Sequence, residues 1–139
     1  MKLYPLIILI IFLAFNSYSQ SNATTVKCKS KTIERVRKYC VCKDIEQYAN
    51  SKYNIYAISS FAKQGENRIY TRFKITSEGK MVDIQIKGSS PELEKEALRT
   101  LESFPDIIPG SIALENNGKT EDTYNVLIKF VVKNQVTNL

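Results

Sequence analysis

The spacing of hydrophobic residues changes several times along the chain, and each change marks an expected element. Over residues 32–50, apolar positions recur every three to five residues, which predicts an amphipathic helix. The polar residues 50–52 are expected to end this helix. A second short helix is expected over residues 53–63, with a turn at residues 64–67 after it.

From residue 69 the period becomes two, as a half-buried strand requires. The alternation predicts a strand over residues 69–76 and a return strand over residues 82–87. Between them, residues 77–80 form a tight turn in which Gly79 can adopt a positive φ. The sequence therefore predicts a β-hairpin.

The next helix begins with a recognisable start signal. Ser90 is expected to be the N-cap and Pro91 the first helical residue. Its apolar stripe consists of Leu93, Ala97, Leu98, Leu101 and Phe104. Pro105 and the Pro109–Gly110 pair are expected to stop it.

A turn at residues 116–119 and a last strand over residues 124–133 complete the pattern. Alternate residues from Tyr124 onward form one apolar face of this strand. Leu127 and Val131 lie on the other face, which predicts that this face is also partly covered. The fold class is therefore α+β, a small two-layer domain with three strands and one or two packed helices. A sheet of this size has exposed edges.

Residues 1–20 have a different composition. A lysine follows Met1, residues 3–15 are almost entirely apolar, and small polar residues follow. This pattern is typical of a secretory signal peptide, and retention as a short inner-membrane anchor is the alternative. We therefore expect a periplasmic or exported protein, or one anchored in the inner membrane, with a basic cysteine-containing segment at residues 21–43 and the domain at residues 44–139.

The net charge of +6 is concentrated near the start of the chain, because residues 27–43 carry seven basic residues and only Glu34 as an acidic one. The simplest interpretation is a solvated helix face, and the alternative is contact with an anionic surface. Nucleic acid is not expected as a partner of an exported protein.

All three cysteines lie in this segment. An oxidising compartment favours a disulfide from Cys28 to either Cys40 or Cys42, which leaves one thiol free or able to join two chains. A Cys-x-Cys pair can also bind a soft metal, but three thiols without histidine are a weak metal site. The 139 residues include no histidine, so most hydrolase triads are excluded. We predict neither an enzyme nor a bound metal or cofactor.

Several of these features, in this order, resemble the TonB C-terminal domain family. The resemblance runs from about residue 45 to residue 133. It rests on a Val-x-Val-x-Phe-like strand at residues 69–73, a Gly-Lys turn with its return strand at residues 79–86, and the helix and Pro-Gly signals at residues 89–110.

The resemblance implies a small α+β domain with a three-stranded antiparallel sheet. It also implies that this periplasmic domain binds the short N-terminal box of a TonB-dependent outer-membrane receptor, and so serves transport across that membrane. The box would add as a strand beside the last strand. The residues that the resemblance assigns to the partner are Tyr124, Asn125, Val126, Leu127, Ile128, Lys129, Phe130, Val131, Val132, Asn50, Ser51 and Lys52.

Two alternatives stay open. The family's energy transducers carry a long proline-rich spacer, whereas residues 21–60 contain no proline. The chain could therefore be an envelope interaction protein that keeps the fold without transducing energy. The exposed last strand could also pair with a second copy to form a homodimer.

Overall fold

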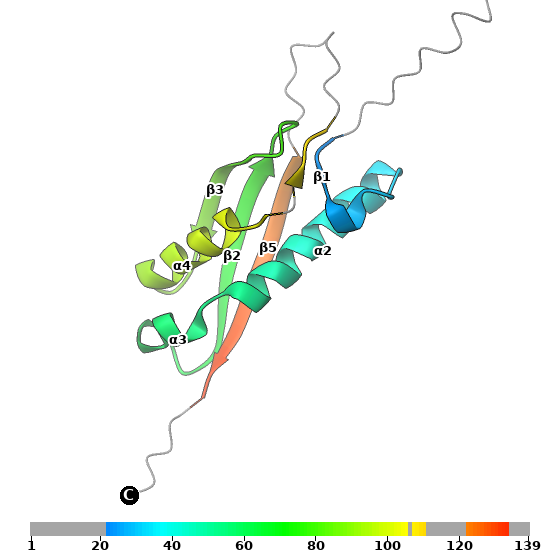
Figure 1. Ribbon diagram of the computed structural model, residues 1–139. Helices are drawn as coiled ribbons and strands as arrows, with labels where there is room; N and C mark the ends of the chain where they lie inside the picture. The colour runs from blue at the N-terminus through cyan, green and yellow to red at the C-terminus, as the bar shows by residue number, and fades with distance from the viewer. Residues whose placement is uncertain (1–21, 106, 111–121, 134–139) are drawn as a thin grey trace, which may run out of the picture.

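The computed structural model describes residues 22–105, 107–110 and 122–133. The predicted signal peptide and the predicted turn at residues 116–119 lie outside them. No helix within these ranges is long and apolar enough to cross a membrane. In chain order (Figure 1) the elements are β1 (Thr24–Thr25), the 3-10 turn η1 (Val26–Cys28), α2 (Glu34–Lys52), α3 (Ile55–Ile58), the 3-10 turn η2 (Ser59–Phe61), β2 (Gly65–Ile75), β3 (Met81–Lys87), α4 (Pro91–Glu102), β4 (Ile107–Ile108) and β5 (Asp122–Val132).

The main sheet has three antiparallel strands in the order β3-β2-β5, which confirms the predicted α+β class. The central strand β2 pairs with β5 along its whole length, from Gly65 opposite Val132 to Ile75 opposite Asp122. The predicted turn at residues 64–67 is therefore wrong from Gly65 onward. The Asn67 side chain holds the bend before the strand, since its amide bonds the backbone of Lys63 at 2.7 and 3.1 Å.

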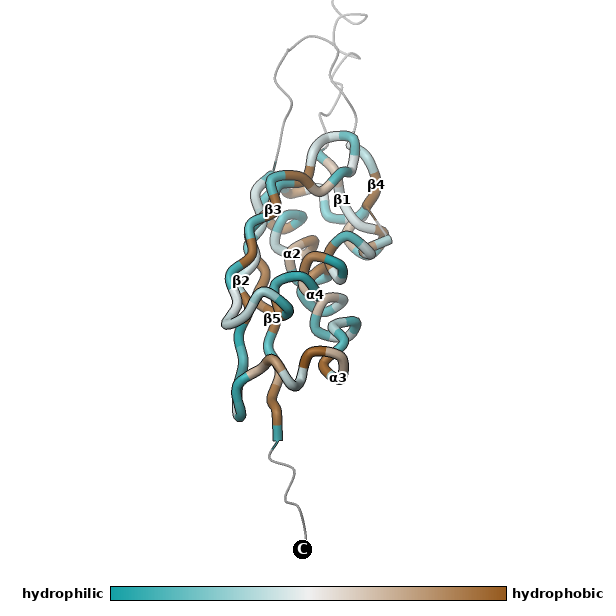
Figure 2. The backbone as a smooth tube through the Cα atoms, turned by 90° about the vertical axis from the view of Figure 1, so that its left-hand side faces the viewer, coloured by the Kyte–Doolittle hydropathy of each residue, from teal (hydrophilic) through white to brown (hydrophobic). Residues whose placement is uncertain are grey.

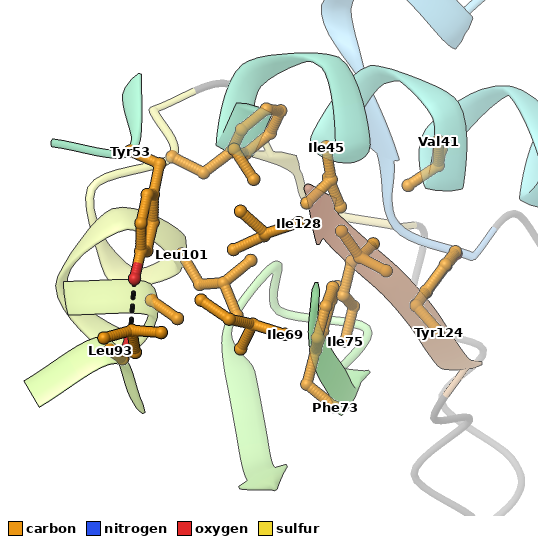
Figure 3. Close-up of a cluster of buried hydrophobic side chains, with 14 of the residues drawn as sticks. Val41, Ile45, Tyr53, Ile69, Phe73, Ile75, Leu93, Leu101, Tyr124 and Ile128 are labelled. Carbon is orange, nitrogen blue, oxygen red and sulfur yellow. Dashed lines mark hydrogen bonds between the residues drawn. The ribbon is translucent and has the colours of Figure 1, made fainter. Parts of the chain in front are cut away.

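The two longer helices, α2 and α4, pack on one face of this sheet, so the molecule has two layers (Figure 2). The core between the layers contains Val41 and Ile45 from α2, Leu93 and Leu101 from α4, and the inward residues of β2 and β5 (Figure 3). The predicted start of α4 is confirmed, because Ser90 Oγ accepts a hydrogen bond from the Leu93 amide.

Helix α2 begins two residues later than predicted and continues through Lys52, so residues 50–52 do not end it. The predicted second helix over residues 53–63 is only the short α3 followed by η2. Its N-cap is Asn54, whose side chain accepts a hydrogen bond from the Ala57 amide. An isolated helix this short has little stability of its own, so packing decides its length.

The pairing of strands β1 and β4 has no counterpart in the hydrophobic pattern. These strands pair antiparallel, with Thr24 opposite Ile108, and two-residue strands are too short to show a period. The outer face of the main sheet is uncovered at Val131, which is 57% exposed, so the predicted partial cover of this residue is wrong. Leu127 on the same face is half-buried.

Candidate functional site

The outer edge of β5 is the candidate site. Because β5 is the last strand of the sheet, only one side of it pairs with β2. Successive residues of a strand direct their backbone groups to opposite sides. The backbone groups of Asn125, Leu127 and Lys129 face away from β2, since each bonds a side chain of α2.

Helix α2 runs beside this edge, in the direction of β5. Near the start of the strand, Arg37 contacts Asp122; one turn further along, Cys42 Sγ donates to the Asn125 carbonyl at 3.2 Å. At the end of the helix, Asn50 reaches the middle of β5. Positions 42 and 50 are eight residues apart and so lie on the same side of the helix. One flank of α2 therefore covers the edge with side chains.

The contact of Asn50 has the form of a strand pairing. Its Nδ2 donates to the Leu127 carbonyl at 3.1 Å, and its Oδ1 accepts from the Lys129 amide at 2.9 Å. The N–H and C=O of one residue make this pattern when they bridge two alternate residues of a parallel neighbour. The two polar atoms of the Asn50 amide therefore stand where the N–H and C=O of one residue of a parallel strand would lie.

A hollow lies beyond Asn50, at the end of β5. It has a volume of about 590 Å³, and Ile55 and Tyr56 of α3 line it together with Val131 and Val132. Tyr56 is almost fully exposed. This hollow is large enough for an apolar side chain of a segment that continues along the strand.

Two residues close in sequence to the lining of the hollow, Tyr53 and Phe130, are held by packing and a hydrogen bond. Tyr53 stacks on Phe130 with ring centroids 5.3 Å apart, and its hydroxyl donates to the Leu93 carbonyl at 3.0 Å (Figure 3). Burial raises the pKa of Tyr53 well above its ordinary value, and the charge of Glu96 acts in the same direction. The phenol therefore stays protonated as a donor and ties α4 to the end of α2.

The other end of β5 is fixed by a buried ion pair. Arg37 donates to Asp122 Oδ2 at 2.7 Å and to the Ala23 carbonyl at 2.6 Å, with both charged side chains about nine-tenths buried. Burial alone would lower the pKa of Arg37, but its hydrogen bonds to Asp122 and Tyr124 outweigh this and raise it. Burial also raises the pKa of Tyr124 to about 12, with Asp122 adding to the effect.

The cysteines are now assigned. Cys28 and Cys40 form a disulfide with an S–S distance of 2.06 Å, one of the two pairings that the sequence left open. Cys42 is the free thiol. Burial raises its pKa, and the charge of Glu46 contributes in the same direction. Two of the three thiols of the Cys-x-Cys metal alternative are therefore used in the disulfide.

The structure separates the predicted site residues into groups. Four of them have side chains buried in the core, so these side chains stabilise the strand and do not face a partner: Tyr124, Val126, Ile128 and Phe130. Among the residues of α2, Asn50 reaches β5, whereas the Ser51 hydroxyl donates to the Tyr48 carbonyl within the helix.

Sequence reasoning did not find the contributions of Cys42, Ile55 and Tyr56. For Cys42 a signal was available, because its spacing from Asn50 places both residues on the same side of the helix. For Ile55 and Tyr56 there was none, because the hollow depends on the shortness of α3, which the hydrophobic pattern did not predict.

Comparison of the chain with protein-family models, with curated proteins and with solved structures found no match. The resemblance to the TonB C-terminal domain family therefore stays a prediction.

Proposed function

We propose that this protein is a peptide-binding module of the cell envelope, which takes up an extended segment as a fourth strand along the outer edge of β5. The observation that carries the proposal is the Asn50 amide, which occupies one rung of a parallel strand at Leu127 and Lys129. An edge that already accepts this geometry from a side chain can accept it from a backbone.

The exchange is energetically feasible. An incoming strand replaces the two hydrogen bonds of Asn50 with two of its own, so this step is nearly balanced, at a net worth of about 0.5–1.5 kcal/mol per bond. The gain comes from new bonds to neighbouring outward groups and from an apolar side chain entering the hollow at Ile55 and Tyr56. Asn50 thus keeps the edge covered in the free protein.

The resemblance to the TonB C-terminal domain family suggests the partner. A periplasmic module with this edge would bind the N-terminal box of a TonB-dependent receptor and take part in transport across the outer membrane. The parallel pattern of the Asn50 bonds adds a direction: the peptide would run along β5 from the Asp122 end to the Val132 end.

The test uses Val131→Pro. By alternation from Lys129, the Val131 amide faces away from β2, and its side chain lies in solvent. Proline at this position removes one outward donor while keeping the pairing with β2. We expect a synthetic receptor-box peptide to bind the purified chain, and this variant to weaken the binding about tenfold, the worth of one hydrogen bond of about 1.4 kcal/mol.

Val131→Ala is the matched control, because it removes the side chain and keeps the amide. It should lose less affinity than the proline variant. Equal losses in the two variants would mean that the peptide contacts only side chains, and unchanged binding in both would place the peptide elsewhere.

A further inference from the structure

The N-terminal half of α2 and the segment before it expose an unusual number of apolar side chains. Ile33 and Tyr39 are 67% and 66% exposed, and Val26 and Val36 are about half exposed. Single apolar residues on a surface are ordinary. Four within fourteen positions, at the same end of one helix, form a surface that needs an explanation.

The disulfide holds together the two segments that carry these side chains. It joins Cys28 to Cys40 with their Cα atoms 5.8 Å apart, which fixes the segment at residues 26–33 against the first turns of α2. Within the helix, Val36 and Tyr39 are three residues apart and share the outward face with Arg35, four residues before Tyr39. We call this surface the docking patch: Val26, Lys31, Ile33, Arg35, Val36 and Tyr39.

The structure also shows which basic residues of this region remain available. Arg37 is buried against Asp122, Lys27 pairs with Asp44, and Lys43 pairs with Glu46. Lys38 lies 4.0 Å from Asp122. The exposed basic residues of this region that form no ion pair with another described residue are Lys29, Lys31 and Arg35. The docking patch therefore combines positive charge with apolar side chains.

The place of the docking patch in the chain indicates its partner. The described structure begins at Asn22, only a few residues before Val26, and the thirteen-residue apolar run at residues 3–15 precedes it in the sequence. If that run is retained as an anchor, it places this end of the domain next to the membrane. If it is removed as an export signal, the docking patch has to hold the domain at the bilayer by itself. Basic side chains among exposed apolar ones suit a bilayer with anionic headgroups.

We propose that the docking patch lies on the surface of an anionic lipid bilayer, with the basic side chains at the headgroups and Tyr39 and Val36 in the interfacial region. The hollow and the docking patch lie at opposite ends of the molecule, since α3 is at the lower left of Figure 1 and the start of α2 is at its right. In a domain bound in this way, the Val132 end of β5 and the hollow point away from the membrane.

The chain contains no tryptophan, so a single one can report the contact without background. We would compare Tyr39→Trp with Tyr70→Trp, a matched control because Tyr70 is 56% exposed on the outer face of the sheet. With full-length protein and vesicles containing phosphatidylglycerol, Trp emission at position 39 should shift to the blue and resist a water-soluble quencher. Emission at position 70 should not change.

Charge gives the second readout. Lys31→Gln with Arg35→Gln should weaken vesicle affinity about 25-fold, since each basic residue near an anionic surface is worth about 1 kcal/mol, or fivefold. The control is Arg72→Gln with Lys87→Gln on the outer face of the sheet, which removes the same charge and should have a smaller effect.

Three results would overturn the proposal. If the Trp at position 39 is quenched as strongly on vesicle-bound protein as in free protein, residues 1–20 alone hold the chain on the vesicle. Equal responses at positions 39 and 70 would show unspecific adsorption. Equal losses in the two charge variants would show that only net charge matters.

Discussion

The two edge strands of the sheet differ in length and regularity. Strand β5 has eleven residues and pairs with β2 without a break in register. Strand β3 has seven, and its register with β2 shifts between Arg72 and Lys74, where Asp83 adopts a φ of 51°. The irregularity is a β-bulge, which twists a strand and interrupts its line of outward hydrogen-bonding groups.

The difference shows two ways of protecting an edge. A bulge such as that of β3 is permanent, because it is built into the backbone. The cover on β5 consists of side chains from α2, above all Asn50, which can rotate away. A straight edge under a removable cover is consistent with the strand binding that we propose for β5.

Each edge strand also carries an ion pair, Asp122 with Arg37 on β5 and Asp83 with Lys74 on β3. The largest expected change in stability comes from breaking the pair on β5. Arg37→Met should lower the free energy of unfolding by about 3 kcal/mol, because it removes the buried partner of Asp122 and leaves this carboxylate only the longer ion-pair contact with Lys38, at 4.0 Å, among the described residues. Lys74→Met is the control: it breaks the exposed pair with Asp83 and should cost less than about 1 kcal/mol. Urea unfolding with the disulfide intact measures both, and similar losses would show that the start of β5 is not held by this pair.

The bulge can be tested next. Asp83→Val should cost about 1–2 kcal/mol, since a β-branched residue is strained at a positive φ. Gln85→Val, two residues further along β3 and exposed in regular strand geometry, should be neutral or slightly stabilising. If both variants unfold at the same denaturant concentration, the contrast between the edges is smaller than the backbone suggests.

Removal of the cover should have a smaller effect. Asn50→Ala should cost about 1 kcal/mol, because three hydrogen bonds of an exposed side chain are lost, two to β5 and one to the Glu46 carbonyl within α2. It should also speed hydrogen exchange of the Lys129 amide. The amides of Ile128 and Phe130, on the β2 side of β5, should stay protected. Ser51→Ala, which touches only the helix backbone, should leave Lys129 unchanged; faster exchange there would contradict the role of Asn50.

A further effect concerns alkaline pH. Burial raises the pKa of Tyr124 from its ordinary value near 10 to about 12, so the folded state keeps a proton that the unfolded state releases. Stability should therefore fall as the pH rises from about 10 to 12. Tyr124→Phe should make this fall shallower and leave its pH dependence near neutrality unchanged; an identical slope would mean that Tyr124 does not titrate in this window.

The sequence predicted the parts of the fold that have a strong period. The hairpin turn with Gly79 at a φ of 81° and the Ser90 cap are confirmed. Of the predicted stripe of α4, Leu93, Ala97 and Leu101 are buried in the helix, whereas Leu98 is half-buried and Phe104 lies beyond the helix end at Glu102. The prediction failed at residues 64–67, because tertiary pairing with β5 outweighs local turn preference.

The geometry of the candidate site could not be predicted from the pattern. Asn50 was expected near the partner, but a polar residue at the end of a helix does not show that its amide will bond an edge strand 77 residues away. Arg37 was counted with the solvated basic residues, yet it is buried against Asp122. Partners so distant in sequence leave no local signal.

The most direct test of the central claim is a residue-by-residue measurement of the β5 edge by NMR, with and without a receptor-box peptide carrying a nitroxide at its N-terminus. We predict slower hydrogen exchange at the Lys129 and Val131 amides and signal broadening near Thr123, because the peptide runs parallel to β5. Protection on β3, or broadening at the Val132 end, would contradict the account.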